Sequence, residues 1–311
     1  MRPGDPRTAR AEVALASARG VGTEIFSSQP RADVIRAAAF SVALYAALAL
    51  AVLGLAVLVL DNLIEGAPRL NPALLTNGTS SLPANAGLRS ALIGTLWIIG
   101  FVIVLIVPLG VGAAVFLEEY AGSRSRVARL IELNVQNLAA VPSIIYGLLG
   151  LAFIARAPLN LGFVVLTASL TLALLVLPVV ILVAREALRA VPGSVREGSL
   201  ALGATKWQTI RHQVLPAAVP GIATGVILAI SRAIGETAPL VPLGAATFVT
   251  FDPNGPFSRY TALPLQIFDW VKQPQAEFQT LAAAAIIVML GLLLAMNSVA
   301  IWLRNRYERS W

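Results

Sequence analysis

The sequence lacks cysteine, has a single histidine and contains few charged side chains. Without cysteine, the chain has no disulfide scaffold, no catalytic thiol and no thiolate metal site. One histidine leaves little basis for a zinc site or a histidine-based catalytic triad. Charged residues make up 13% of the 311 residues, which is about half the share of a typical soluble domain. A soluble globular protein is therefore not expected.

Hydrophobic residues are abundant instead, at 57% of the chain, and the mean hydropathy is +0.79. A hydrocarbon core of about 30 Å requires roughly 20 consecutive apolar residues in a helix. Six stretches meet this requirement, and they are too long and too irregular in alternation to be strands. The sequence thus predicts an all-α integral membrane protein with six transmembrane helices, at about residues 37–60, 91–117, 134–155, 161–184, 217–240 and 281–303.

The net charge of +7 arises from 23 Lys and Arg against 16 Asp and Glu. Most of the positive residues fall in residues 1–36, in the loops after the second and fourth spans, and in residues 304–311. This asymmetry predicts that both termini are cytoplasmic. The organisation is then a partly disordered N-terminal tail (1–36), a six-span domain (37–303) and a short C-terminal tail (304–311). The charge is explained by topology, so no nucleic-acid partner is expected.

The loop between the fourth and fifth spans, residues 185–216, is too long and too patterned for a simple turn. Ser194 precedes Glu197 by three residues, the spacing of a capping box, and Thr205 and Gln208 repeat it. Gly203 can supply a left-handed helix end between them. We expect two short helices joined at residues 203–204.

One interpretation of this loop is a pair of amphipathic helices in the headgroup region. The apolar side chains facing lipid would be Leu200, Leu202, Trp207 and Ile210. A second short loop carries Glu118, Glu119 and Glu132 beside three arginines, and we expect a screened surface cluster there.

Arg232 and Glu236 are two charges inside the fifth span, which we expect to be helical as far as Pro239. A charge near the bilayer centre costs about 2.5–3.5 kcal/mol on insertion scales, so such residues usually serve a function. Four-residue spacing places both on one helix face. They could form a structural ion pair, or line a path for a tetrahedral oxyanion, which a guanidinium binds through two oxygens. A nearby carboxylate would favour phosphate, which keeps a proton near pH 7, over sulfate.

The loop from Glu197 to Pro216 resembles the EAA loop of ABC importer permeases, with Gly198-Ser199 in place of two alanines and Gln213 in place of an aliphatic residue. The resemblance implies a coupling helix that fits a groove on a cytoplasmic ATPase. The residues that would couple to the ATPase are Glu197, Gly198, Ser199, Leu202, Gly203 and Ala204.

Residues 231–240, Ser-Arg-Ala-Ile-Gly-Glu-Thr-Ala-Pro-Leu, are similar to the signature of phosphate ABC importer permeases of the PstA type. Residues 116–120, 141–148 and 263–268 agree, and the resemblance covers roughly residues 31–309. It implies a permease subunit that moves inorganic phosphate by alternating access, with Arg232 and Glu236 in the substrate path. Members often carry arginine where this chain has Leu182. Arg185, one turn further on, either makes the inner phosphate contact or only orients the helix at the cytoplasmic surface.

The resemblance also implies the partners: a homologous PstC-type permease subunit, two ATP-binding subunits and an external phosphate-binding protein. The chain has no Gly-x4-Gly-Lys-Ser/Thr motif. It is therefore not expected to be an enzyme or to bind a cofactor or metal, and ATP and Mg would be used by the partner ATPase.

The loop at residues 241–280 could dock the binding protein through its aromatic residues, or these could lie at the interface with membrane lipid. The candidate docking residues are Phe257, Tyr260, Phe268 and Trp270. The expected location is the cytoplasmic membrane of a prokaryote. Alternative functions are an ABC permease for another oxyanion or small solute, or a non-transport membrane protein with a structural Arg–Glu pair.

Overall fold

The computed structural model describes residues 31–121, 125–243 and 249–307, and the chain divides into two units, residues 1–60 and 61–311. In the first unit, the described residues form most of helix α2 (Arg31–Gly66). Every side chain from Ile35 to Leu60 is exposed, and this stretch is apolar enough to cross a membrane. The predicted disorder of the N-terminal tail falls mostly on residues 1–30, which lie outside the described residues.

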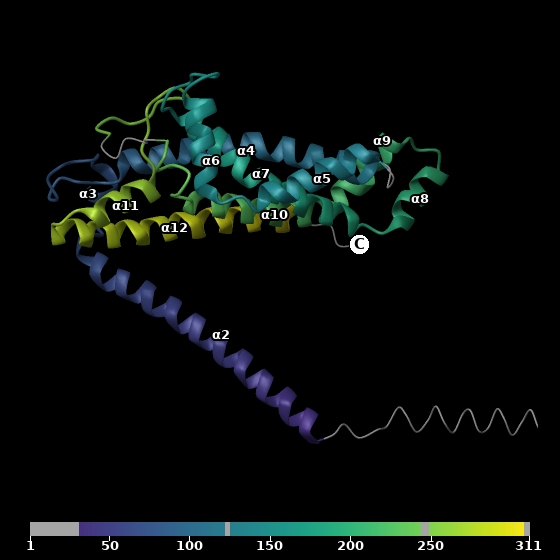
Figure 1. Ribbon diagram of the computed structural model, residues 1–311, viewed down its shortest axis with the longest axis horizontal. Coiled ribbons are helices and arrows are strands. Elements are labelled where there is room, and N and C mark those ends of the chain that lie inside the picture. Colours follow the sequence, from purple (N-terminus) through teal and green to yellow (C-terminus); the bar gives the residue numbers. More distant parts are fainter. Residues whose placement is uncertain (1–30, 122–124, 244–248, 308–311) are drawn as a thin grey trace, which may run out of the picture. The chain divides into compact units, whose positions relative to one another are not determined.

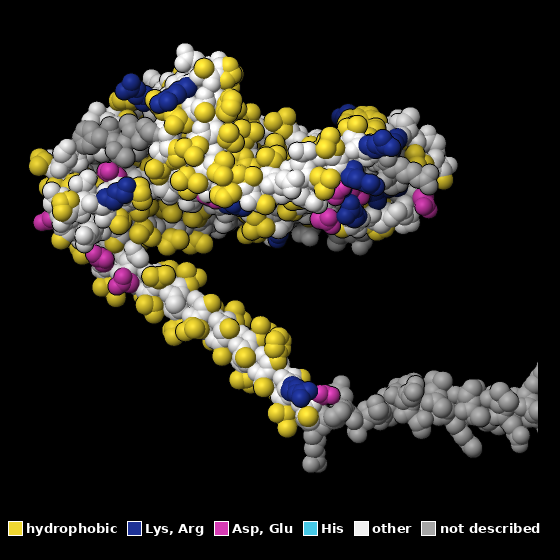
Figure 2. Space-filling model, in the orientation of Figure 1, with side chains coloured by type: hydrophobic (Ala, Val, Ile, Leu, Met, Phe, Trp, Pro, Cys, Tyr) yellow, Lys and Arg dark blue, Asp and Glu magenta, His cyan; other side chains and the backbone are white. Residues whose placement is uncertain are grey.

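The second unit is a bundle of long helices with short helices at each end (Figure 1). Helix α7 is the most buried of the membrane-spanning candidates and packs against α4 and α10. On the face in Figure 2, hydrophobic side chains cover the middle of this unit, and most charged side chains gather toward its two ends. The long helices are α4 (Arg89–Val115), α7 (Val165–Arg189), α10 (Leu215–Gly235) and α12 (Ala276–Tyr307).

The short helices lie at the two ends of the bundle. Helices α3 (Pro72–Thr76) and α11 (Leu263–Lys272) are at one end. Helices α8 (Gly193–Ala201) and α9 (Lys206–Thr209) lie at the other. The prediction of an all-helical membrane protein is confirmed. By length and composition, five of the described helices can cross a membrane, and a bent pair could be the sixth span.

The buried polar residues of α7 show how this core tolerates hydroxyl groups. Ser169 donates to the carbonyl of Val165 at 2.8 Å, and Thr171 donates to that of Thr167 at 2.8 Å. A hydroxyl that bonds back to its own helix leaves no unpaired polar group in an apolar environment. The helix can therefore place these small side chains at close contacts without a desolvation cost.

The third predicted span, residues 134–155, is not one helix. Helix α5 (Arg126–Ala139) is followed by α6 (Ser143–Leu149), which continues as the π-helical segment η3 (Gly150–Ala155). The two parts meet at an angle of 104°. Pro142 lacks an N–H and keeps the residue before it out of helical conformation, which explains the break.

The fifth predicted span also has different bounds. Helix α9, the π-helical segment η4 (Ile210–Val214) and α10 follow one another without a gap, so this span runs from Lys206 to Gly235. The second short helix expected in the loop is therefore the first turn of the fifth span. It begins with the predicted capping box of Thr205 and Gln208, which is confirmed.

The turn between α8 and α9 has the left-handed helix end that was predicted at Gly203. Gly203 has φ +83°, its N–H donates to the carbonyl of Leu200, and the N–H of Ala204 donates to that of Ser199. These are the two hydrogen bonds of a Schellman helix end. The predicted capping box at Ser194 is wrong, because the N-cap of α8 is Pro192, two residues earlier, and the helix has no side-chain cap.

We predict that Gly203→Ala loosens this turn, because a Cβ in the left-handed region costs about 1–2 kcal/mol. Amide hydrogen exchange of residues 193–209 should accelerate by about 5- to 30-fold. Gly198→Ala is the matched control, since it lies in α8 with a Cβ site free of neighbours within 4 Å. Equal exchange rates in the two variants would contradict the prediction.

Candidate functional site

The predicted pair of Arg232 and Glu236 is present, with Nε of Arg232 at 3.1 Å from Oε1 of Glu236. Glu236 is not inside the helix, however. Helix α10 ends at Gly235, and Glu236 has extended backbone angles (φ −77°, ψ 107°). Pro239 explains this end, because a proline cannot donate to the carbonyl four residues earlier and its ring clashes with it.

The two side chains differ in exposure. The Arg232 side chain is 46% exposed and that of Glu236 is 18% exposed. Among the described residues, the contact with Glu236 engages only Nε of the guanidinium. Its two terminal nitrogens are therefore the groups that could bind another acceptor, and a guanidinium suits a two-oxygen acceptor such as an oxyanion.

The unwound segment after α10 is held in place by the bent pair. A Cβ on Gly147 of α6 would lie 2.3 Å from the carbonyl oxygen of Pro239, so the two backbones touch. Tyr146 beside it is buried and donates to the carbonyl of Leu138 at 2.8 Å, which ties α6 to α5. Sequence reasoning noted residues 141–148 only as a resemblance and did not assign Gly147 this positioning role.

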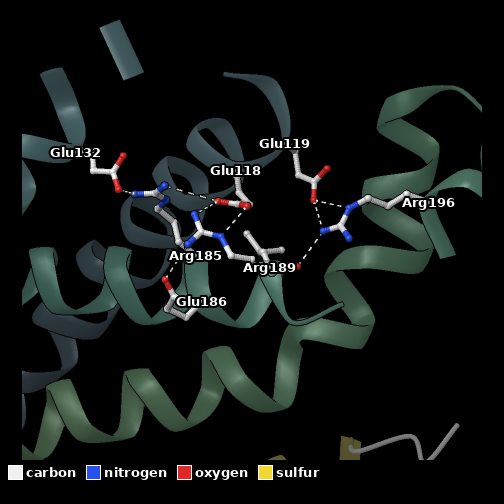
Figure 3. Close-up of polar contacts among 8 residues, drawn as sticks. Glu118, Glu119, Glu132, Arg185, Glu186, Arg189 and Arg196 are labelled. Atoms are coloured by element: carbon white, nitrogen blue, oxygen red, sulfur yellow. Dashed lines mark hydrogen bonds and ion pairs between the residues drawn. The ribbon is translucent and has the colours of Figure 1, made fainter. Parts of the chain in front are cut away.

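A second group of charges lies at the α8 end of the bundle (Figure 3). Arg185 of α7 is 10% exposed at its side chain and pairs with Glu132 at 3.1 Å and with Glu118 at 3.6 Å. Arg189 pairs with Glu118 at 3.0 Å. We use the name charge cluster for Glu118, Glu119, Glu132, Arg185, Glu186, Arg189 and Arg196.

The prediction of a screened surface group is wrong for Glu118 and Glu119, whereas the Glu132 side chain is 40% exposed. Glu118 and Glu119 belong to the π-helical segment η2 (Phe116–Tyr120) at the end of α4, and their side chains are only 18% and 8% exposed. Removing one partner of such a buried pair costs about 3–5 kcal/mol, whereas an exposed pair contributes little. Arg185 is likewise a buried, paired residue and not a surface arginine.

Arg196 makes the largest number of contacts in the charge cluster. Nη2 and Nε lie 2.7 and 3.1 Å from Oε1 of Glu119. The same guanidinium donates to the carbonyls of Leu188 at 2.8 Å and Val191 at 2.7 Å, at the end of α7. Sequence reasoning missed this contact because its partners are 77 residues apart, and no local pattern joins them.

A polar cavity of about 400 Å³ adjoins the charge cluster. Glu118, Arg129, Glu132, Arg185 and Arg189 contribute to its wall. The Nε of Arg185 is buried and, among the described groups, has no hydrogen-bond partner. Within the described residues no group of three His, Asp or Glu side chains could hold a metal ion.

One face of helix α8 packs against the rest of the protein, and the opposite face is exposed. Val195, Arg196 and Ser199 are half-buried, and the Ser199 hydroxyl is 2.9 Å from that of Thr209. The remaining predicted coupling residues, apart from half-buried Ala204, are exposed: Glu197, Gly198, Leu202 and Gly203.

The interpretation of this loop as two lipid-facing helices fits less well, because Ile210 is buried at 1% exposure. Leu200, Leu202 and Trp207 are exposed. The apolar set that was to face lipid is therefore divided between the protein core and the surface.

The aromatic residues proposed for docking in the loop 241–280 are divided in a similar way. Phe257 and Phe268 are exposed, whereas Tyr260 and Trp270 are buried at 1%. Burial raises the pKa of the Tyr260 phenol. Tyr260 and Trp270 are thus core residues, and residues 244–248 of this loop lie outside the described residues.

Comparison with known proteins gives the class of this fold. A chain of the crystal structure of a bacterial alginate ABC transporter, in complex with an alginate-bound periplasmic protein, superposes with a TM-score of 0.64. The alignment covers 88% of this chain and 96% of that chain at 15% identity. At this identity the likeness shows the fold alone.

The sequence comparisons define the family. The family described as binding-protein-dependent transport system inner membrane component matches residues 106–309. The chain is 33% identical over 235 residues to the phosphate transport system permease protein PstA of Haemophilus influenzae, covering 75% of this chain and 81% of that protein. It is 34% identical over 208 residues to the probable ABC transporter permease protein YqgI of Bacillus subtilis, covering 66% and 69%. The chain belongs to the family of binding-protein-dependent transport system inner membrane components and is a multi-pass membrane protein.

We predict that Gly147→Ala displaces the unwound segment that carries Glu236, because the added methyl would meet the Pro239 backbone at 2.3 Å. Overpacking of this kind lowers the free energy of unfolding by about 1–3 kcal/mol. The measurement is thermal unfolding of the purified chain in detergent. Gly235→Ala is the control, since its Cβ would meet nothing within 4 Å. A Gly147→Ala variant as stable as the control would contradict the contact.

Proposed function

We propose that this chain is the permease subunit of an ATP-driven importer that moves inorganic phosphate across the cytoplasmic membrane by alternating access. The observation that carries the proposal is the half-exposed Arg232 guanidinium, paired through Nε with the more buried Glu236. It occurs in a chain of the ABC importer permease family whose relatives include proteins named PstA.

The chemistry of this pair favours phosphate over a fully ionised oxyanion. Two terminal nitrogens of Arg232 can donate to two phosphate oxygens. Glu236 repels an anion without a proton but accepts a hydrogen bond from a phosphate that keeps one near pH 7. The alternative is an ABC permease for another oxyanion or small solute, which the same guanidinium could also serve.

The two ends of the bundle fit the proposed topology. The positive-inside rule places the α8 end, both termini and the charge cluster in the cytoplasm, and the α3 and α11 end outside. In this orientation, the exposed face of α8, with Glu197, Gly198, Leu202 and Gly203, meets an ATPase subunit, and Ser199 and Ala204 support that face from the inside. The exposed Phe257 and Phe268 then remain available to an external binding protein.

The assembly we propose contains a homologous PstC-type permease, two ATP-binding subunits that use ATP and Mg, and an external phosphate-binding protein. The structural neighbours of this chain include an ABC importer crystallised with its periplasmic protein, which supports this kind of assembly. Arg185 remains a candidate for an inner phosphate contact. It borders the polar cavity, but phosphate would have to compete there with Glu118 and Glu132.

We predict that Arg232→Ala lowers the rate of phosphate uptake by the intact complex by about 10- to 100-fold, which corresponds to losing a charge-assisted hydrogen bond. Arg232→Lys keeps the charge but not the two-oxygen geometry and should recover only part of the rate. Arg156→Ala, an exposed arginine just after η3, is the control. Normal uptake by Arg232→Ala at normal expression would exclude the proposed role of this residue.

We further predict that Glu236→Gln lowers the discrimination of phosphate against sulfate by about tenfold, since a site that recognises a substrate O–H loses selectivity when its acceptor changes. Competition of sulfate with labelled phosphate uptake measures this ratio. Glu277→Gln, at an exposed position of α12, is the control. An unchanged ratio would show that Glu236 does not read the phosphate proton.

A further inference from the structure

Arg196 lies outside the proposed substrate path and off the exposed face of α8, yet it joins α8 to two other parts of the bundle. Its guanidinium contacts Glu119 of η2, at the end of α4, and two carbonyls at the end of α7. It stands directly before Glu197, which points away from the chain. Arg196 thus connects the inner face of α8 to two long helices of the bundle (Figure 3).

The contacts of Arg196 add a donor to two carbonyls near the end of α7 and neutralise a buried carboxylate. The Leu188 carbonyl also accepts the N–H of Val191 at 3.3 Å, and the Val191 carbonyl lies just beyond the last residue of α7, Arg189. Glu119, at 8% exposure, is too buried to be left without a counter-charge. Replacing the contact by water is therefore unfavourable, and this makes the connection stiff.

The other inner-face contacts of α8 are made by uncharged side chains. The Ser199 hydroxyl meets that of Thr209, in the helix that continues into α10. Val195 packs in the apolar cluster with Leu188 and Val214. Among the described contacts, Arg196 makes the ion pair that joins α8 to η2, through Glu119 at the end of α4.

We propose that Arg196 is a positioning residue that transmits the movement of α8 to α4 and α7, and that its pair with Glu119 stays formed through the transport cycle. This inference rests on the proposed function, because it requires an ATPase that moves α8. The contact of Ser199 with Thr209 of α9 moves the span that carries Arg232, and the Arg196 contact moves the two helices packed beside that span. Loss of Arg196 would then remove the ion pair of α8 with the end of α4, while Val195 and residues 190–192 still connect α8 to α7.

The test measures ATP hydrolysis and phosphate uptake together in the reconstituted complex. For Arg196→Met we expect hydrolysis to be retained and uptake per ATP hydrolysed to fall about tenfold. Arg126→Met is the control, since it removes an exposed arginine at the start of α5 that lies outside the charge cluster and outside the wall of its cavity. Its uptake per ATP should stay within about twofold of the unsubstituted complex.

The double variant Arg196→Met/Glu119→Gln distinguishes a purely structural role of Arg196 from the proposed role in transmitting movement. It removes the buried charge that Arg196→Met alone leaves unpaired. We expect it to recover thermal stability but not uptake per ATP. If it recovers both, Arg196 only neutralises Glu119 and the proposal is wrong.

A covalent connection gives the opposite test. The chain has no cysteine, so Glu119→Cys/Arg196→Cys can be crosslinked by a short bifunctional methanethiosulfonate in a complex without other reactive thiols. We expect low uptake per ATP before crosslinking, recovery after it, and loss again on reduction. Inhibition by the crosslink would show that the contact must open, and would overturn the proposal. If the unsubstituted complex hydrolyses ATP but imports no phosphate, the proposed substrate fails, and the same ratios for the solute it does import still test Arg196.

Discussion

The constraint on which this structure depends is that backbone polar groups inside a membrane must be satisfied within the protein. Helices meet it, so the places where helices stop are the unusual ones. The chain stops two of them close together, at the bend between α5 and α6 and at the end of α10. Gly147 beside the first break touches Pro239 in the second. The irregular backbone after α10 is therefore covered by α6, and Arg232 and Glu236 lie beside this place.

Charge is treated differently at the two ends of α10. Near Gly235, Arg232 keeps nearly half of its side-chain surface open although it is paired. At the α8 end, Arg196 is enclosed by the carboxylate of Glu119 and two backbone carbonyls. A guanidinium with free donors can exchange a bound anion, whereas one with its donors occupied holds helices together. The same side chain thus has two roles, and its exposed fraction distinguishes them.

Sequence patterns predicted what is local. The capping box at Thr205 and the left-handed Gly203 depend on neighbours a few residues away, and both are present. The apolar runs located most helices because length and composition determine a membrane span. What could not be predicted depends on residues distant in the chain. The pairing of Arg196 with Glu119 is of this kind, because packing between helices brings the two residues together. The bend at Pro142 has a local cause, which hydropathy does not reveal.

The continuity from α9 to α10 bears on how the two ends could communicate. The span from Lys206 to Gly235 has 30 residues, which is about 45 Å of helix at 1.5 Å per residue. One end is bonded to α8 through Thr209 and the other carries Arg232. A π-helical segment and Pro220 lie between them, and both are features that let a helix bend. A span of this kind alone would lose part of an imposed movement to bending. A second connection through Arg196 to α4 and α7, which pack against α10, would constrain that bending and make the movement at Arg232 follow that of α8.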